Sequence, residues 1–110
     1  MAEVKDYVAD IKKYATSVDE AAVAGMAKTY ALVMSKADSR YVAVSDAEEV
    51  LRVVEGFLKK KLGRKEPDAE LVAAVKAQGE KMKGDRTKSR LTVYYLLAEH
   101  FKQLALFHPK

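Results

Sequence analysis

The sequence predicts an all-α protein, a single helical domain over residues 1–110 with about five helices in an irregular array around a buried C-terminal helix. Apolar residues recur at intervals of three and four along most of the chain, the spacing that places side chains on one helix face. The only run of strand-forming residues, 41–44, is short and has no second run to pair with. Residues 91–98 are apolar around nearly the whole circumference of a helix, and such helices are usually buried.

Two helices are predicted in the first third of the chain. Residues 3–15 carry apolar side chains at helical spacing, and the pattern is interrupted directly after them. A second helix is predicted for roughly 18–37. Ser17 and Glu20 have the spacing of a capping box, in which the hydroxyl binds a free amide of the first turn and the carboxylate binds back. We therefore expect Ser17 to be the N-cap of the second helix.

Residues 38–44 are expected to form an extended connection whose apolar side chains pack on the helices. A second capping box, Ser45 with Glu48, begins the third predicted helix, which runs to about residue 62. Gly63 follows its last turn, where a glycine commonly adopts the left-handed conformation that ends a helix.

The last two helices are predicted on either side of Gly84. Pro67 suits the first turn of the fourth helix, because the backbone amide needs no partner there. The fifth helix is predicted for about 85–105, with Phe101 on its dominant apolar arc and Thr92 on its narrow polar stripe. We therefore expect Phe101→Ala to cost about 3–5 kcal/mol and Thr92→Ala less than about 1 kcal/mol.

Composition places the chain among globular proteins of one domain. Of its 110 residues, 49% are hydrophobic and 33% are charged, which is enough for one self-supporting core. There is no cysteine, so neither a disulfide nor thiolate chemistry is available, and the cytoplasm is the expected location. No run approaches the ~20 apolar residues that cross a bilayer, and we expect no membrane insertion.

Few residues suggest catalysis or metal binding, and we expect neither an enzyme nor a cofactor or metal. The two histidines, His100 and His108, have no cysteine or carboxylate pair at metal-ligand spacing beside them. Ser17, Ser45 and Ser89 each lie where a helix is predicted to begin, and capping explains them. Neither a Gly-x-Ser-x-Gly motif nor a Walker A motif is present.

Positive charge is concentrated in the second half of the chain. Residues 1–51 hold six basic and nine acidic residues, whereas residues 52–110 hold fourteen and seven. Two basic blocks, 59–65 and 81–90, lie at predicted helix ends, where short loops can bring them together into one positive patch. The candidate anion-binding residues are Lys59, Lys60, Arg64, Lys81, Lys83, Arg86, Lys88 and Arg90.

Within this set, the residues beside a predicted helix N-terminus are expected to be the strongest anion contacts. Arg86 and Lys88 lie next to backbone amides that have no partner inside the helix, and such amides favour phosphate or sulfate. The alternative interpretation is that both blocks are ordinary solvated surface.

Three blocks of the chain are distinctive: Gly-Phe-Leu-Lys-Lys-Lys-Leu-Gly at 56–63, Glu-Lys-Met-Lys-Gly-Asp-Arg-Thr-Lys-Ser-Arg at 80–90, and Tyr-Tyr-Leu-Leu-Ala-Glu at 94–99. Together they resemble a family of small bacterial proteins classed only as a domain of unknown function. The resemblance covers about residues 45–104 and implies a small all-helical bacterial protein. It implies no activity, cofactor or site residue.

Two functions from different classes remain open. The first is a small non-enzymatic interaction module that associates with itself. A helix that is apolar nearly all round is hard to cover with four short helices, so we expect a homodimer with the 85–105 or the 3–15 helix at its interface. The alternative is an anion- or nucleic-acid-binding protein, in which the basic blocks 59–65 and 81–90 bind RNA weakly, without regard to its sequence, and release it as salt rises.

Overall fold

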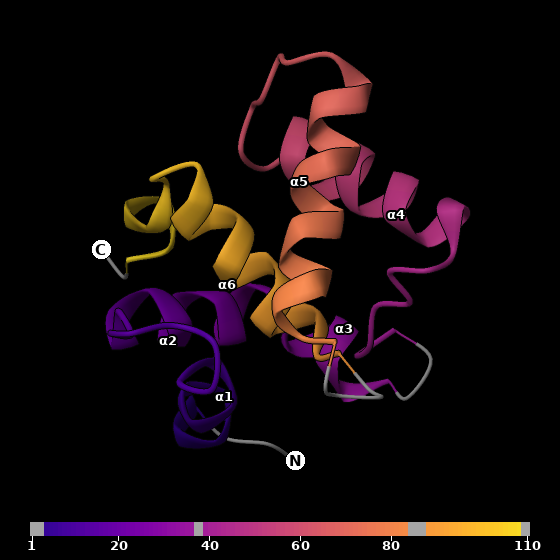
Figure 1. Cartoon of the computed structure of the whole chain (residues 1–110). Helices are drawn as coiled ribbons and strands as arrows, with labels where there is room; N and C mark the ends of the chain where they lie inside the picture. Colours follow the sequence, from indigo (N-terminus) through magenta and orange to yellow (C-terminus); the bar gives the residue numbers. More distant parts are fainter. Residues whose placement is uncertain (1–3, 37–38, 84–87, 109–110) are drawn as a thin grey trace.

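The computed structural model describes residues 4–36, 39–83 and 88–108, and within these ranges it contains helices and no strand. The predicted all-α class is confirmed. None of the helices in these ranges is both long and apolar enough to cross a bilayer. The elements follow one another along the chain (Figure 1) as α1 Val4–Ile11, α2 Glu20–Thr29, α3 Ala31–Ser35, α4 Ala47–Val53, the π-helical segment η1 Val54–Lys59, α5 Asp68–Lys81, α6 Arg90–His100 and the 3-10 helix η2 Leu104–Phe107.

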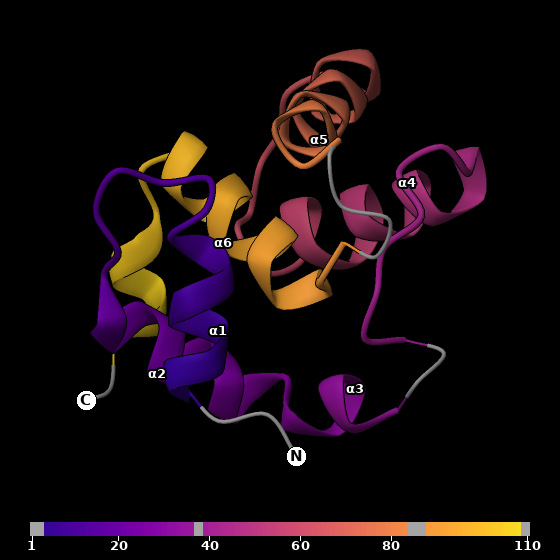
Figure 2. The ribbon, with the colours of Figure 1, turned by 60° about the horizontal axis from the view of Figure 1, so that its bottom comes forward.

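Helix α6 is the central element of the molecule. α1 and α2 pack on one side of it, and α5 packs on the other together with the α4–η1 segment (Figures 1 and 2). Every residue from Leu91 to Ala98 is buried. The expectation of a buried C-terminal helix at the centre of the array is therefore confirmed, and the chain's own elements cover it.

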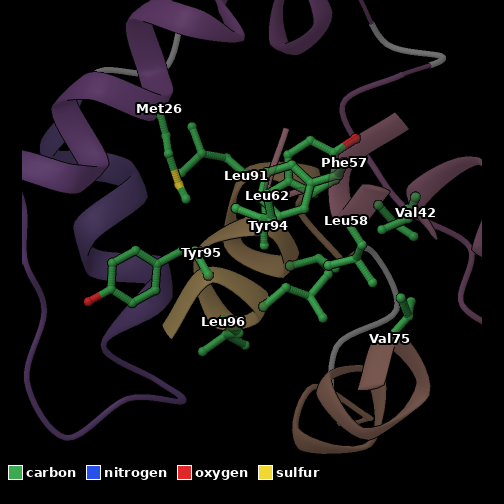
Figure 3. Packing of buried hydrophobic residues seen from close by; sticks show 14 of the residues in the cluster. Met26, Val42, Phe57, Leu58, Leu62, Val75, Leu91, Tyr94, Tyr95 and Leu96 are labelled. Carbon is green, nitrogen blue, oxygen red and sulfur yellow. The ribbon is translucent and has the colours of Figure 1, made fainter. Parts of the chain in front are cut away.

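An aromatic cluster joins the two sides of the core. The ring of Tyr94 on α6 stacks on Phe57 of η1, with ring centroids 4.0 Å apart (Figure 3). Tyr30, directly after α2, meets Tyr94 edge-on at 5.0 Å, and Phe107 of η2 stacks on Phe57 at 6.1 Å. Such pairs each contribute about 0.5–1.5 kcal/mol beyond the area they bury. The cluster therefore ties the α2–α3 junction, η1, α6 and η2 together.

The two N-terminal helices are shorter than the sequence predicts. α1 ends at Ile11 rather than near residue 15, and the helix predicted for 18–37 is divided into α2 and α3. The division is at Tyr30, whose backbone leaves the helical region at φ −107° and ψ 18°. Its ring belongs to the aromatic cluster described above. The break between α2 and α3 therefore coincides with the tertiary packing of Tyr30. The alanine-rich sequence around it gives no local indication that the helix is interrupted there.

Aspartates, rather than the predicted serines, cap the helices. Asp19 accepts a hydrogen bond from the amide three residues on at 3.1 Å, and Asp46 accepts one from the amide two residues on at 2.9 Å. The prediction that Ser17 and Ser45 are the N-caps is wrong. Because serine and aspartate cap helices about equally well, the local pattern does not separate neighbouring candidates. At the first site, packing makes the choice, since Asp19 Oδ2 also lies 2.5 Å from His108 Nε2.

The third predicted helix is found as two continuous segments of different geometry. Regular α-helix ends at Val53, and the π-helical η1 carries the chain on to Lys59. Gly63 has a φ of +69°, and the Arg64 amide donates to the carbonyl of Leu58 at 2.9 Å, so the predicted left-handed end is confirmed. α5 then begins one residue after Pro67.

The fifth predicted helix is shorter at its C-terminal end. α6 ends at His100 instead of near residue 105, and the beginning of the predicted range, 85–87, lies outside the described residues. Lys102 adopts a left-handed φ of 58°, and the Gln103 amide donates to the carbonyl of Ala98 at 2.7 Å. This turn sends the chain back, so that η2 packs on α2.

The burial predicted for two residues of this helix is also wrong. Thr92 is fully buried rather than exposed, and its hydroxyl donates to Asp10 Oδ2 on α1 at 2.5 Å. Phe101 is only half-buried, and its ring lies 4.5 Å from the Arg64 guanidinium. The reason is that α1 packs on α6, where it covers the polar residue Thr92. The losses of stability expected for Phe101→Ala and Thr92→Ala were argued from the predicted burial, and they no longer follow from it.

The described part of the predicted connection is extended, as expected, but it has a partner. Tyr41 and Ser89 form an isolated antiparallel bridge. The Val42 amide donates to the carbonyl of Lys88 at 2.8 Å, and the amide that follows Ser89 donates to the carbonyl that precedes Tyr41 at 2.7 Å. Val42 is buried. This short ladder holds the segment that leaves α3 against the residues that enter α6.

Candidate functional site

A cavity of about 620 Å³ opens in the described part of the chain. It lies between α1, α2, α3 and the ladder formed by residues 40–41 and 89, elements that lie together in Figure 2. Cavities of about 300–1,000 Å³ are typical of sites for small molecules. Its lining combines an apolar part, namely Val4, Ala24, Ala27, Ala31 and Met34, with a polar part, namely Asp6, Tyr7, Asp10, Lys28, Ser35, Arg40, Tyr41 and Ser89.

The alanines of α2 and α3 explain why there is space at this place. Ala24, Ala27 and Ala31 recur at intervals of three and four, so they fall on one side of the α2–α3 segment. The larger residues Val23 and Met26 point instead into the core, where both are fully buried. A methyl side chain fills little of the space between helices, so this side of the segment remains hollow.

Two polar atoms in the lining have no hydrogen-bond partner among the described residues. They are Arg40 Nε and Ser89 Oγ, and both are buried. Arg40 is held in place through its Nη2, which donates to the carbonyl of Ser35 at 3.1 Å. The ladder fixes the backbone of both residues, because Ser89 is paired with Tyr41 and the Arg90 amide donates to the Arg40 carbonyl at 2.7 Å. A buried polar group without a partner costs about 1–3 kcal/mol, so this pair requires an explanation.

The charges in the cavity are balanced between its acidic and basic sides. Two acidic and two basic residues line it, and the Asp10 carboxylate already accepts from Thr92 at 2.5 Å and lies 3.4 Å from Lys13 Nζ. Burial raises the pKa of the Tyr7 phenol, while the positive charge of Arg40 opposes that shift. Tyr7 therefore stays a neutral hydroxyl at physiological pH, available to donate or accept a hydrogen bond.

The first basic block is mostly engaged within the protein. Lys59 Nζ lies 2.8 Å from both Glu55 and Asp68 carboxylates, and the Lys60 side chain is exposed. Arg64 is a structural residue. Its guanidinium pairs with Glu66 at 2.5 Å, donates to the Gln103 side chain at 3.2 Å and stacks over Phe101.

The second basic block is divided between surface and core. Lys81, the last residue of α5, and Lys83, which follows the helix, are exposed. Lys88 is half-buried, and Arg86 lies outside the described residues. Arg90 is buried, and each of its three guanidinium nitrogens donates a hydrogen bond within the fold. Its guanidinium donates to the Glu49 carboxylate, to the carbonyl of Ser39, and to the Tyr94 hydroxyl at 3.1 Å.

The structure does not bring the described parts of the two blocks together. Lys59 pairs with Asp68, the first residue of α5, whereas Lys81 is the last residue of that helix. A helix of 14 residues is about 21 Å long, so the blocks lie at its opposite ends. The expectation that short loops join them into one patch is wrong, because α5 stands between them. A smaller group, Lys76, Lys83 and Lys88, lines a shallower cavity of about 320 Å³ beside Val44 and Gly79.

Sequence reasoning did not identify Arg40 as a site residue, and it explained Ser89 as a helix cap. Ser89 does precede the first residue of α6, but its side chain makes no capping hydrogen bond. The capping explanation is therefore wrong for Ser89. The available signal was the strand-forming run at 41–44, for which the sequence predicted an extended connection and no partner strand. The residues that pair with this run lie about half of the chain away, so the local sequence does not identify them.

No group of three or more histidine and acidic side chains gathers anywhere in the described ranges. The family model for a protein of unknown function, DUF2853, matches residues 6–105. The chain belongs to the DUF2853 family. The three blocks at 56–63, 80–90 and 94–99 all fall within the matched range, so the resemblance seen in the sequence is confirmed. None of the curated proteins matches this member of the family.

Proposed function

We propose that this DUF2853 protein is a non-enzymatic binding module, and that its site is the cavity between α1, α2 and α3. The observation that carries this proposal is a hollow of about 620 Å³ whose lining is mainly apolar and includes a few polar side chains. Small-molecule sites typically combine an apolar wall with a few polar groups that orient the ligand. The ligand that fits this arrangement is small and has an apolar body.

The chemistry of the cavity supports binding rather than catalysis. A serine nucleophile needs a general base within hydrogen-bond reach. Ser89 Oγ has no hydrogen-bond partner among the residues that the structure describes. The Asp10 carboxylate, one of the acids in the lining, is already bound by Thr92. These groups are arranged to hold a ligand in one orientation.

Self-association remains a prediction, but its original argument is weaker. It depended on an apolar helix that other elements could not cover, and α6 is buried by elements of the same chain. The exposed large apolar side chains include Leu32, Leu51 and Leu106, which lie on α3, α4 and η2 respectively. Light scattering over a range of protein concentrations tests the homodimer directly. A constant monomer mass would contradict it.

Weak anion or nucleic-acid binding is the second candidate, and one observation favours it. Lys76, Lys83 and Lys88 line the same shallow cavity together with a single acidic residue, Glu80, so positive charge is in excess there. This group is smaller than the patch expected from the sequence, since Arg64 and Arg90 are used within the fold. We therefore rank it below the binding of a small ligand.

A neutral fluorescent probe tests the proposed site without assuming a charge on the ligand. N-phenyl-1-naphthylamine brightens when it leaves water, and we expect it to bind the protein with saturation at one molecule per chain. Ala27→Leu fills part of the cavity and should weaken this binding about tenfold, a change of about 1.4 kcal/mol. The matched control is Ala73→Leu, an exposed position on α5 outside the cavity, which should leave the affinity unchanged.

The melting curve of each variant, followed by circular dichroism, shows whether it is folded. If the probe does not bind the wild-type protein, or if Ala27→Leu and Ala73→Leu bind it equally well, the cavity is not a ligand site.

A further inference from the structure

The hydroxyl of Tyr7 is a polar group of the cavity lining that a ligand can reach. Tyr7 lies on α1 and is half-buried, and no hydrogen bond to its hydroxyl is found within the described residues. Arg40 Nε and Ser89 Oγ are buried out of a ligand's reach, whereas the Tyr7 oxygen is not among the buried atoms without a partner and so keeps accessible surface. This hydroxyl can therefore form a hydrogen bond with a molecule that fills the hollow.

The surroundings of Tyr7 favour its role as a hydrogen-bond donor. Burial raises the pKa of the phenol, so the proton stays on the oxygen. The positive charge of Arg40 opposes that shift, and the charge of Asp6 acts in the other direction with a smaller effect. A nearby cation polarises the O–H bond and makes it a better donor. The ligand atom that meets Tyr7 is therefore an acceptor.

The balance of charges in the lining favours an uncharged ligand. Two acidic residues, Asp6 and Asp10, line the cavity together with two basic residues, Lys28 and Arg40. An ion of either sign is attracted by one pair and repelled by the other, and it also loses the water that solvated its charge. An uncharged polar group loses much less on leaving water, and one hydrogen bond compensates for most of that loss.

The apolar part of the lining determines the body of the ligand. Ala27, Ala31 and Met34 present no hydrogen-bond donor in their side chains. We infer that the site takes an uncharged carbonyl compound, whose oxygen accepts a hydrogen bond from the Tyr7 hydroxyl and whose hydrophobic body lies on α2 and α3. A carbonyl oxygen is an acceptor that brings neither a charge nor a donor of its own. This inference rests on the proposed function, to which it adds a class of ligand and the residue that selects it.

Displacement of the neutral probe by small benzene derivatives of similar size tests the inference. Acetophenone carries the carbonyl group, ethylbenzene has nearly the same shape without an acceptor, and benzoate and benzylammonium carry a negative and a positive charge. We expect acetophenone to displace N-phenyl-1-naphthylamine from the wild-type protein at about tenfold lower concentration than either ion, because neither ion recovers the hydration that it loses. Ethylbenzene is the reference for the hydrophobic body alone.

Two tyrosine variants assign the hydrogen bond to its donor. Tyr7→Phe removes only the hydroxyl, so it should weaken displacement by acetophenone about fivefold and leave displacement by ethylbenzene unchanged. This variant should still bind the probe, which has no carbonyl group, as the wild type does, and that also shows that it is folded. Tyr14→Phe is the matched control, because Tyr14 lies outside the lining and its buried hydroxyl has no partner within the described residues. It should leave both ligands unaffected.

The outcomes separate the two proposals. If the probe does not bind the wild-type protein, the proposed function itself fails. If the probe binds but benzoate or benzylammonium displaces it as well as acetophenone does, the inference of an uncharged ligand is overturned and the cavity remains a ligand site. If Tyr7→Phe weakens acetophenone no more than ethylbenzene, or no more than Tyr14→Phe does, the hydrogen bond from Tyr7 is refuted and the inference fails with it.

Discussion

Arg90 shows how far the role of one charged residue depends on its surroundings. The sequence places it in a basic block, where solvation or anion binding is the expected role. In the structure its guanidinium is buried and reaches Glu49 on α4, the carbonyl of Ser39 and the Tyr94 hydroxyl. Each of its three nitrogens already donates a hydrogen bond within the fold, which leaves little of this buried charge for an external anion. Arg90 is therefore a structural residue that locks α6 to α4 and to the extended connection.

This arrangement predicts a large difference between two arginines that pair with the same carboxylate. Arg90→Ala leaves the buried Glu49 without its main partner and should lower the free energy of unfolding by about 3–5 kcal/mol. Arg52 also pairs with Glu49, at 3.1 Å, but its side chain is 71% exposed, so Arg52→Ala should cost less than about 1 kcal/mol. Urea denaturation measures both. Equal midpoints for the two variants would show that the buried pair adds nothing to stability.

At the scale of elements, helix boundaries follow tertiary contacts as much as local sequence. The aromatic ring of Tyr30 divides α2 from α3, and the left-handed Lys102 turns the chain from α6 into η2. η2 then packs closely on α2, where Gly25 allows the approach. A Cβ atom built on Gly25 would lie 1.6 Å from the carbonyl oxygen of Phe107, which is backbone and has little freedom to move.

Two glycine substitutions test this close approach. Gly25→Ala should displace η2 and destabilise the protein by more than about 2 kcal/mol, because overpacking forces the backbone to shift. Gly56→Ala is the control, since nothing lies within 4 Å of its added Cβ. Alanine is the better helix former, so Gly56→Ala should be neutral or stabilising by up to about 1 kcal/mol. Thermal unfolding measures both variants, and a Gly25→Ala protein as stable as the wild type would refute the close contact.

At the scale of the whole molecule, the fold separates charges that are grouped along the chain. α5 holds the 59–65 block at one end and Lys81 and Lys83 at the other. Ion pairs with Glu55, Asp68 and Glu66 reduce the free positive charge of the first block further. Among the residues that the structure describes, a few lysines remain at each end of α5, too few to act as one extended surface for a nucleic acid.

This separation predicts weak binding of RNA at most. We expect labelled single-stranded RNA to bind with a dissociation constant no tighter than about 10 µM near physiological salt, without preference for sequence, and to be released as salt rises. Lys83→Ala should weaken any binding at low salt, because this lysine belongs to the group beside α5. Fluorescence anisotropy at two salt concentrations measures these effects. Submicromolar binding at physiological salt would favour the nucleic-acid function over the small ligand.

The sequence by itself determined the fold class, the central helix and some of the turns. Apolar residues at intervals of three and four, the near-continuous apolar run at 91–98 and Gly63 act over one or two helical turns, so they can be interpreted without knowing the partners. The structure agrees on each, with α6 buried and Gly63 at a φ of +69°. The family blocks could also be seen in the sequence alone, and the family match confirms them.

Only the tertiary structure decided which polar residues are buried and where the cavity lies. Thr92 is buried because it meets Asp10, 82 positions earlier in the chain, and Arg90 is buried because it meets Glu49, 41 positions earlier. The cavity forms where α1, the alanines of α2 and α3 and the pairing of Tyr41 with Ser89 come together. Such contacts depend on how separate elements pack. The spacing of apolar residues along the chain describes one element at a time, and therefore it does not specify the contacts between elements.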